Sequence, residues 1–287
     1  MSRRKNLTRK RRTRSRKSVK RLKGAARSGG APDIAQEDVG FILLRCVRKK
    51  EQNTLYKECY EAIRKYHPDL KIIIIDDNSD KNVLENDYPM KNVEIIESEY
   101  PAAGEYLPYW YLLQRKMFKK AIFIQDSMIL NTRIPFEEVN DYMYLYEFQS
   151  NNPKYHNFIP NDDIINLLKL TKDSENIMKY YNAGDWKGCW GSMMLITSDF
   201  ISELEEKVGI SAWKGVINTR AQRMALESAI GLSCMYIKHD KEKYSFFGDW
   251  ADSNTFQYPG NEKHTLDMYL ADKSMIKDKL IKIWNGR

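Results

Sequence analysis

Four consecutive isoleucines, Ile72–Ile75, run directly into Asp76-Asp77-Asn78-Ser79-Asp80. A short β-branched run with no polar alternation is typical of a strand buried on both faces of a parallel sheet. Such a strand requires neighbouring strands on either side and helices above and below it. This feature therefore predicts an α/β fold.

Short apolar segments alternate with helical patterns along the first half of the chain. Residues 39–47 predict a first strand, and a helix is expected from a cap at Asn53 or Thr54 until Pro68. Strands at 93–97 and 121–124 flank a helix expected over about 105–119, and further helices are expected over 199–208 and 218–237. This order predicts a Rossmann-like, mainly parallel central sheet flanked by helices, with ligands bound at the carboxyl ends of its strands.

Charge is distributed very unevenly. Residues 1–30 hold 14 of the 47 Lys and Arg and no Asp or Glu, so the remaining chain carries 33 − 39 = −6. The basic stretch has little to bury, and Ser28-Gly29-Gly30-Ala31-Pro32 is typical of a linker. We expect a disordered basic tail and linker over 1–37 and one domain over 38–287.

The basic tail leaves several roles open: nuclear targeting, contact with nucleic acid or another anionic surface, or a packaging appendage without a specific ligand. We expect that removing residues 1–30 leaves catalysis intact. No apolar stretch approaches the ~20 residues of a membrane-spanning helix. The basic start has no apolar signal region after it, and the four cysteines form no C-x-x-C pair. A cytoplasmic protein is therefore expected.

Several large enzyme classes lack their motifs in this chain. There is no G-x-x-x-x-G-K-[ST] loop for nucleoside triphosphates, no G-x-G-x-x-G after a strand, and no G-x-S-x-G elbow. These absences argue against ATPases or GTPases, nicotinamide enzymes and α/β-hydrolases.

The segment Asp76–Asp80, with Asn53, Leu55, Cys59 and Ala62-Ile63 ahead of it, resembles the nucleotide-sugar motif of GT-A fold glycosyltransferases, especially the large inverting family 2. The likeness covers about residues 39–130. It implies transfer of a sugar from a nucleotide-diphosphate donor to an acceptor hydroxyl of a glycan, protein or lipid, with inversion. Asp76, Asp77 and Asp80 would then bind the donor, and Arg45 and Val47 would line the base pocket. An ordinary Asp-rich turn at a strand end is the alternative.

Gln125-Asp126-Ser127 occupies the place of that family's D-x-D motif, where two carboxylates hold Mn²⁺ or Mg²⁺ against the diphosphate. This chain departs from the pattern because it offers one carboxylate. The resemblance implies donor contacts from Gln125 and Asp126, and a cation held by Asp126. A late histidine, His239 or His264, is the candidate second ligand. Each histidine also suits an ordinary packed or surface position.

A glycine- and tryptophan-rich segment, 184–193, suits a backbone that passes close to a sugar ring. Trp190 and Gly191 are its candidate donor contacts, and an aromatic core turn is the alternative. In the helix expected over 218–237, Glu227 resembles the family's catalytic base, and Arg223 or Arg220 would face the leaving diphosphate. Asp185 and Asp199 are rival bases, and an Arg223–Glu227 surface ion pair is the alternative interpretation.

The C-terminal run from Lys282 to Arg287 is basic and aromatic, so it either folds over the donor phosphates or frays. Together these features favour a metal-assisted glycosyltransferase, which in its soluble body and basic tail is similar to transferases carried by large DNA viruses. Two other hypotheses remain: a GT-A-like binding protein without activity, and a particle-associated protein that binds nucleic acid through its tail.

Overall fold

The computed structural model describes residues 37–152, 160–239, 243–253, 264–275 and 277–284. The chain divides into two units, Met1–Asp33 and Ile34–Arg287. Everything below concerns the second unit. The predicted tail lies outside the described residues except for Glu37, so the expected boundary after residue 37 remains a prediction.

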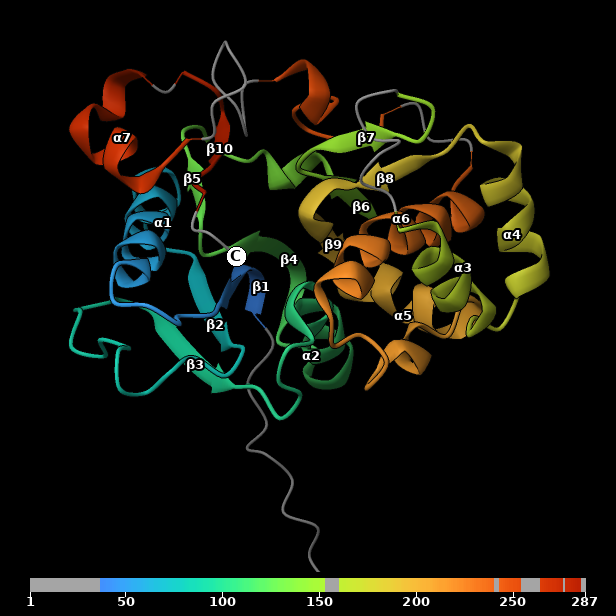
Figure 1. Ribbon diagram of the computed structural model, residues 1–287, viewed down its shortest axis with the longest axis horizontal. Helices are drawn as coiled ribbons and strands as arrows, with labels where there is room; N and C mark the ends of the chain where they lie inside the picture. The colour runs from blue at the N-terminus through green and yellow to red at the C-terminus, as the bar shows by residue number, and fades with distance from the viewer. Residues whose placement is uncertain (1–36, 153–159, 240–242, 254–263, 276, 285–287) are drawn as a thin grey trace, which may run out of the picture. The chain divides into compact units, whose positions relative to one another are not determined.

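A six-stranded sheet with the order β3-β2-β1-β4-β9-β6 forms the centre of this unit (Figure 1). The first four of these strands are parallel, β9 is antiparallel to β4, and β6 is antiparallel to β9. This confirms the predicted α/β fold with a mainly parallel sheet. The strands are β1 (Glu37–Arg45), β2 (Lys71–Asp76), β3 (Val93–Glu97), β4 (Phe118–Gln125), β6 (Tyr142–Tyr144) and β9 (Met194–Thr197).

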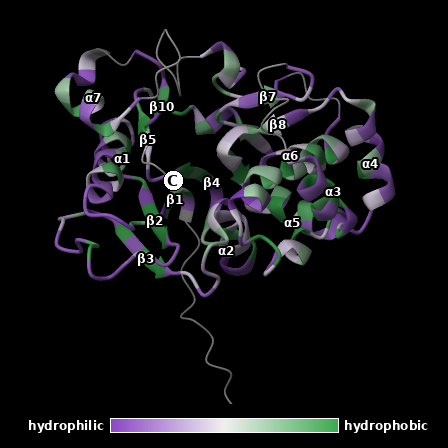
Figure 2. Cartoon of the chain, in the orientation of Figure 1, coloured by the Kyte–Doolittle hydropathy of each residue, from purple (hydrophilic) through white to green (hydrophobic). Residues whose placement is uncertain are grey.

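Both faces of the sheet are covered, as the isoleucine run required. Ile72 and Ile74 face a core with α1 (Gln52–Tyr66), whereas Ile73 and Ile75 face a second core with helices α2, α5 and α6. The strand β2 is accordingly hydrophobic along most of its length in Figure 2. The helices of the second face are α2 (Leu107–Arg115), α3 (Asn161–Lys169), α4 (Ser174–Ala183), α5 (Ser198–Lys207) and α6 (Arg220–Ile237).

Two small antiparallel pairs lie beside the main sheet. One joins β7 (Glu147–Gln149) to β8 (Lys187–Cys189), and the other joins β5 (Met128–Leu130) to β10 (Leu280–Lys282), which follows α7 (Leu266–Ala271). The expectation of a frayed end over 282–287 is wrong for residues 282–284, because Lys282 belongs to β10 and the N–H groups of Ile283 and Trp284 donate to the carbonyls of Ser127 and His264. Residues 285–287 lie outside the described residues. The pair β5–β10 matters below because β5 begins two residues after Asp126.

Local capping explains where α6 begins, but the cap expected for α1 is not found. Thr219 and Gln222 form a reciprocal capping box at the start of α6, so the helix begins at Arg220. The predicted cap of α1 is wrong: that helix begins at Gln52, whose side chain accepts the N–H groups of Arg48 and Lys49. Asn53 instead bonds to the backbone of Lys50, Val83 and Glu85.

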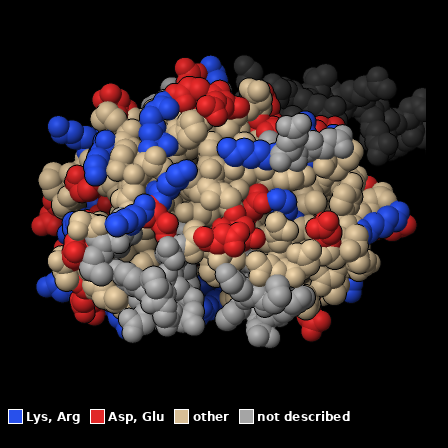
Figure 3. Space-filling model, turned by 90° about the horizontal axis from the view of Figure 1, so that it is seen from above, with Lys and Arg blue, Asp and Glu red and all other residues tan. Residues whose placement is uncertain are grey.

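The described surface carries both signs of charge. On the face shown in Figure 3, Lys and Arg side chains are interspersed with Asp and Glu. Within the described ranges, no helix has the length and apolarity needed to cross a membrane.

Candidate functional site

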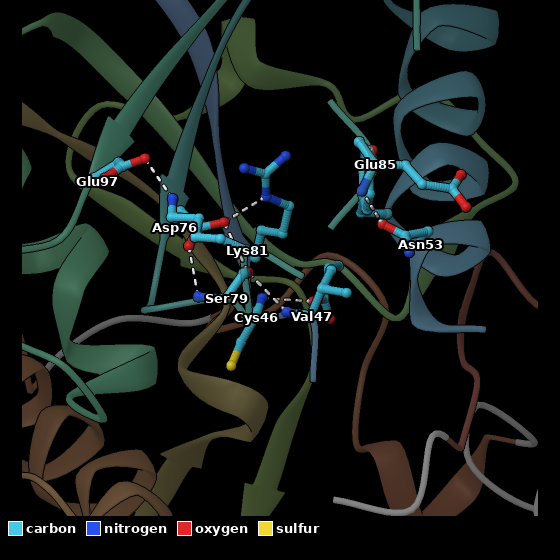
Figure 4. A network of polar contacts seen from close by, with 11 residues as sticks. Cys46, Val47, Asn53, Asp76, Ser79, Lys81, Glu85 and Glu97 are labelled. Atoms are coloured by element: carbon cyan, nitrogen blue, oxygen red, sulfur yellow. Dashed lines mark hydrogen bonds and ion pairs between the residues drawn. The ribbon is translucent and has the colours of Figure 1, made fainter. Parts of the chain in front are cut away.

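The carboxyl ends of β1 and β2 are joined by a buried ion pair. Arg45 and Asp76 are register partners, Nε of Arg45 donates to Oδ2 of Asp76 at 2.7 Å, and the side chains are 2% and 1% exposed. Ser79 donates its N–H to Oδ1 and its hydroxyl to Oδ2 of Asp76, both at 2.8 Å (Figure 4). The Arg45 guanidinium also lies 5.1 Å from the ring centroid of Tyr56. We call Arg45, Asp76 and Ser79 the Arg45 edge.

The carboxylate of the Arg45 edge is satisfied from within the protein, whereas Nη1 of Arg45 is buried without a hydrogen-bond partner. The Asp76 carboxylate accepts three hydrogen bonds, and the Ser79 hydroxyl in turn accepts the N–H of Val47 at 2.8 Å. The two predicted roles, Asp76 for the donor and Arg45 and Val47 for the base, therefore coincide with a rigid junction between two strand ends. The Asp80 carboxylate accepts the backbone N–H and the side-chain amide of Asn82.

Asp77 shapes the loop that follows β3. Its two carboxylate oxygens accept the N–H groups of Ala102 at 2.6 Å and Gly104 at 3.0 Å. Burial raises the pKa of Asp77, and these two N–H groups act against that rise. Gly104 has a φ of +50°, and a Cβ there would lie 2.2 Å from Cδ of Arg223, so only glycine fits. Asp77 thereby fixes the position of Glu105, which follows Gly104 in the chain.

Gln125, the last residue of β4, connects three distant segments. Its amide nitrogen donates to Oε1 of Glu105 at 3.2 Å and to the carbonyl of Gly191 at 3.0 Å. Its amide oxygen accepts from Nζ of Lys282 in β10. Gln125 thus occupies the predicted place, and it joins Glu105 and Lys282, which sequence reasoning did not pair with it.

The turn Trp190–Ser192 packs closely against Gln125. Gly191 has a φ of +63°, and a Cβ there would approach Cε of Met193 at 2.8 Å and the Gln125 amide nitrogen at 3.2 Å. The half-buried Trp190 ring contacts Tyr146 edge-on at 6.1 Å and Trp250 at 5.6 Å between centroids. Trp190 therefore packs as the aromatic core turn of the alternative interpretation predicts. Gly191, in contrast, lies directly against Gln125.

Glu227 lies in α6 near this turn and is partly exposed. Desolvation raises the pKa of Glu227 from 4.5 to about 8, and the charge of Glu105 adds to the rise. The Gly191 N–H and the Lys282 charge lower it. A carboxyl group that titrates near neutral pH suits a general base.

Arg223 lies one helical turn before Glu227 but pairs elsewhere. Its Nε is 3.1 Å from Oε2 of Glu105, and its Nη1 donates to the carbonyl of Ala102 at 3.0 Å. It therefore holds the loop that carries Glu105. We call Glu105, Gln125, Arg223, Glu227 and Lys282 the Glu227 edge. The rival bases Asp185 and Asp199 are exposed.

The predicted cation ligands do not come together in the described part of the chain. Asp126 is buried, and its Oδ2 accepts the N–H of Cys46 at 2.9 Å. His239 is exposed and follows α6, whose end is about 15 Å along the helix axis from Glu227. His264 is buried, and its carbonyl accepts the N–H of Trp284 beside β10.

A divalent cation of the Mg²⁺ or Mn²⁺ type requires several oxygen ligands. Among the described residues, no three His, Cys, Asp or Glu side chains are grouped so that they could hold a metal ion. The donor set at Asp126 therefore does not fit such a cation, and the predicted metal site remains untested.

No protein-family model matches the chain, and no curated protein matches it significantly. Among solved structures, it is similar to S. aureus TarS 1–349, with 14% identity over 38% of this chain and 35% of that one, at a TM-score of 0.28. It is also similar to the galactosyltransferase LgtC in complex with donor and acceptor sugar analogs, with 9% identity over 86% of this chain and 87% of that one, at a TM-score of 0.40.

The chain thus spans about a third of the TarS structure and most of the LgtC structure. Likeness at these TM-scores carries no functional conclusion. It gives no support to the expected viral origin.

Proposed function

We propose that this chain is a GT-A-type glycosyltransferase, which moves a sugar from a nucleotide-diphosphate donor to an acceptor hydroxyl. The observation that carries this proposal is the Glu227 edge. There a partly exposed carboxyl group with a pKa of about 8 lies near two cationic side chains, Arg223 and Lys282. Ligands of parallel α/β sheets bind at the carboxyl ends of the strands, and Gln125 places this edge there.

Glu227 is the proposed general base. The acceptor oxygen forms a bond to the anomeric carbon of the donor while its proton passes to the Glu227 carboxylate. The bond between the anomeric carbon and the phosphate oxygen breaks, and its electron pair leaves with the nucleoside diphosphate. Attack from the side opposite the leaving group gives inversion. A base with a pKa near the working pH combines adequate basicity with a useful ionised fraction.

In this proposal, the other side chains position the donor and the loops around it. The Arg45 edge fixes the ends of β1 and β2, beside which the nucleotide of a donor would lie. Asp77 fixes the loop that supplies Glu105. The half-buried Trp190, beside Gly191, is the proposed aromatic contact for a sugar. The acceptor, the donor sugar and the compartment in which the reaction takes place stay open.

A binding protein without turnover is the second candidate. The single carboxylate in Gln125-Asp126-Ser127 favours it, because a metal-dependent transferase needs more oxygen ligands than this segment gives. Both candidates bind a nucleotide sugar, so turnover separates them.

The test is release of nucleoside diphosphate by the full chain from UDP-glucose, UDP-galactose, UDP-N-acetylglucosamine and GDP-mannose, with and without simple sugar acceptors. We expect turnover with one donor class and a 10²- to 10⁴-fold loss in Glu227→Gln, about the usual contribution of a general base. Glu206→Gln, an exposed carboxylate on α5, is the matched control and should retain full activity.

Three outcomes contradict parts of the proposal. Unchanged turnover in Glu227→Gln removes Glu227 as the base. Donor binding without turnover in the wild type supports the binding protein. Neither binding nor turnover with any of the four donors overturns both candidates.

A further inference from the structure

Glu105 belongs to the Glu227 edge, but the proposed reaction gives it no step. It lies in the short 3₁₀ helix η1 (Gly104–Tyr106), directly ahead of α2. Its side chain is 23% exposed, and the side chain of Arg223, with which it pairs, is 28% exposed. A charged group that is withdrawn from water needs partners, so the contacts of Glu105 indicate its role.

Glu105 joins the end of β4 to the first turn of α6. Its Oε1 accepts the side-chain N–H of Gln125 at 3.2 Å, and its Oε2 lies 3.1 Å from Nε of Arg223. This second oxygen is buried and accepts no hydrogen bond from the described residues, so it contacts Arg223 as an ion pair without hydrogen-bond geometry. The contact with Arg223 therefore depends on the charge of Glu105, whereas the contact with Gln125 requires only an oxygen atom.

Gln125 and Gly191 continue this connection to Glu227. The amide nitrogen of Gln125 also donates to the Gly191 carbonyl at 3.0 Å, and the Gly191 N–H donates to the Glu227 carboxylate. Glu227 and Arg223 lie four positions apart on one face of α6. The contacts therefore close on themselves. We call these five residues the Glu105 network: Glu105, Gln125, Gly191, Arg223 and Glu227.

The backbone around the Glu105 network leaves little freedom. Asp77 accepts the Gly104 N–H and so holds the start of η1. Gly104 has a φ of +50°, and a Cβ there would lie 2.2 Å from Cδ of Arg223. Gly191 has a φ of +63°, and a Cβ there would lie 3.2 Å from the Gln125 amide nitrogen. Both close approaches require glycine, so the network is built into the backbone rather than formed by adaptable surface side chains.

The titratable groups that face Glu227 come from several neighbouring elements. They are Glu105 of η1, Tyr109 of α2, Cys189 of β8 and Lys282 of β10. Burial raises the pKa of Tyr109 and the pKa of Cys189 well above their ordinary values, so both side chains are neutral near neutral pH. Glu105 raises the pKa of Glu227, and Lys282 lowers it. Glu105 therefore favours the form that Glu227 takes once it has accepted a proton.

We propose that Glu105 is a positioning residue of the proposed reaction: it closes the Glu105 network and thereby holds the Glu227 carboxylate at the end of β4. The inference rests on the proposed function. The acceptor proton still passes to Glu227, and Glu105 exchanges no proton with the substrate. Because a displacement of about 1 Å from the productive position can cost ~100-fold in rate, a residue that fixes Glu227 affects turnover without touching the reacting atoms.

The test is turnover of the full chain with its preferred donor, measured as kcat, as KM for the donor and as a pH profile. Glu105→Gln keeps an oxygen for Gln125 but removes the charge that pairs with Arg223. We expect kcat to fall about tenfold, while KM for the donor stays within about twofold of the wild type. The rising limb of the profile should move to lower pH, because the charge that raises the pKa of Glu227 is lost. A variant that is merely less stable would leave the limb in place.

Two further variants separate position from charge. Glu105→Asp keeps the charge on a side chain that is one methylene shorter, so it cannot hold both contacts. We expect a lower kcat with a pH profile close to that of the wild type, and this variant also serves if Glu105→Gln does not fold. Glu99→Gln removes an exposed carboxylate ahead of η1 and should match the wild type in kcat, KM and pH profile.

A second readout needs no substrate. The side-chain carboxyl carbon of Glu227 is followed by carbon NMR in protein labelled at glutamate, and its signal is identified by its absence from Glu227→Gln. We expect a titration midpoint near pH 8 in the wild type and a lower midpoint in Glu105→Gln. Glu99→Gln should leave the midpoint unchanged.

The outcomes separate the inference from the function on which it rests. Full kcat in both Glu105→Gln and Glu105→Asp overturns the role of Glu105 while the transferase stands. An unchanged midpoint of Glu227 in Glu105→Gln overturns that role as well, whether or not turnover is found. A wild type that turns over none of the donors contradicts the proposed function itself, and the midpoint alone then decides whether Glu105 acts on Glu227.

Discussion

The Arg45 edge and the Glu227 edge lie at the same end of one sheet but differ in how their charges are satisfied. Arg45 and Asp76 are at most 2% exposed, and the Asp76 carboxylate takes three hydrogen bonds from within the segment 45–79. Glu105, Arg223, Glu227 and Lys282 are all partly exposed, and they come from three segments far apart in the chain.

The difference has an energetic meaning. A buried ion pair fixes geometry, because removing one partner leaves the other charge without compensation. A carboxyl group with a pKa near neutral can still gain or lose a proton, and cations within reach of solvent can still bind a ligand. We infer that the Arg45 edge is the frame and that the Glu227 edge carries the chemistry.

The sharpest way to break this comparison is to remove Asp76. Asp76→Ala leaves the Arg45 guanidinium buried without its carboxylate, and we expect a loss of about 3–5 kcal/mol in the free energy of unfolding. Urea denaturation of the full chain measures it. Asp80→Ala, in the same turn, removes an exposed-side carboxylate bond to Asn82 rather than a buried ion pair; it is the control and should cost about 1 kcal/mol or less.

A companion variant shows whether the pair fixes geometry or supplies stability. The double change Arg45→Met with Asp76→Leu removes both charges, and it should cost less than Asp76→Ala alone. A double variant as unstable as the single one would mean that the ion pair is itself a net stabiliser.

The second prediction concerns Asp77, which connects the two edges. Asp77→Asn keeps the size of the side chain but cannot accept both the Ala102 and the Gly104 N–H. One buried donor is then unsatisfied, at a cost of about 1–3 kcal/mol in unfolding free energy. Because Glu105 follows directly, turnover of the preferred donor should fall as well. Full turnover in a destabilised variant would show that the loop position does not matter for the reaction.

Asp76 and Ser79 of the Arg45 edge could be located from the sequence, because they follow the isoleucine run within a few residues. Four isoleucines require a buried strand, and the polar residues after them must lie at its carboxyl end. The sequence does not predict which of these polar groups form hydrogen bonds with one another. The pairing of Asp76 with Arg45 depends on the register between β1 and β2, which no local pattern specifies.

The Glu227 edge was predictable only in part. Gln125, Gly191, Arg223 and Glu227 were singled out through a family resemblance, and the fold brings them near one another. Glu105 was missed because a lone glutamate ahead of an apolar helix carries no signal of its own. Lys282 was expected only as part of a basic segment, since its partner depends on an antiparallel pairing between residues about 150 positions apart.

The third prediction uses the titration of Glu227. The proposed base has a pKa of about 8, so it is mostly protonated below pH 8. Turnover should therefore rise about tenfold per pH unit between pH 6 and 8 and level off above pH 8. The groups that face Glu227 are Glu105, which raises its pKa, and Lys282 and the Gly191 N–H, which lower it. Lys282→Gln should therefore move the profile to higher pH. A flat profile would exclude a base with this pKa.

Stability provides an independent check of the same group. Because the folded-state pKa of Glu227 lies above its ordinary value of 4.5, its protonated form is favoured in the folded protein. That contribution is present below about pH 4.5 and is lost as the pH rises through about 8. The urea midpoint of Glu227→Gln should therefore rise relative to the urea midpoint of the wild type as the pH increases from 5 to 9. An unchanged difference would indicate a Glu227 that is ionised throughout.

The smallest expected effect lies at the margin of the Arg45 edge, where Lys81 pairs with Glu97 (Figure 4). Glu97 is the register partner of Asp76, so the two carboxylates occupy adjacent strand ends. Their surroundings differ, because the Lys81 and Glu97 side chains are 54% and 72% exposed. Solvent screens such a pair, and Lys81→Ala should change the free energy of unfolding by about 1 kcal/mol or less. A loss as large as that of Asp76→Ala would mean that burial is not what distinguishes the frame of this site, and the contrast between the two edges would then need another physical basis.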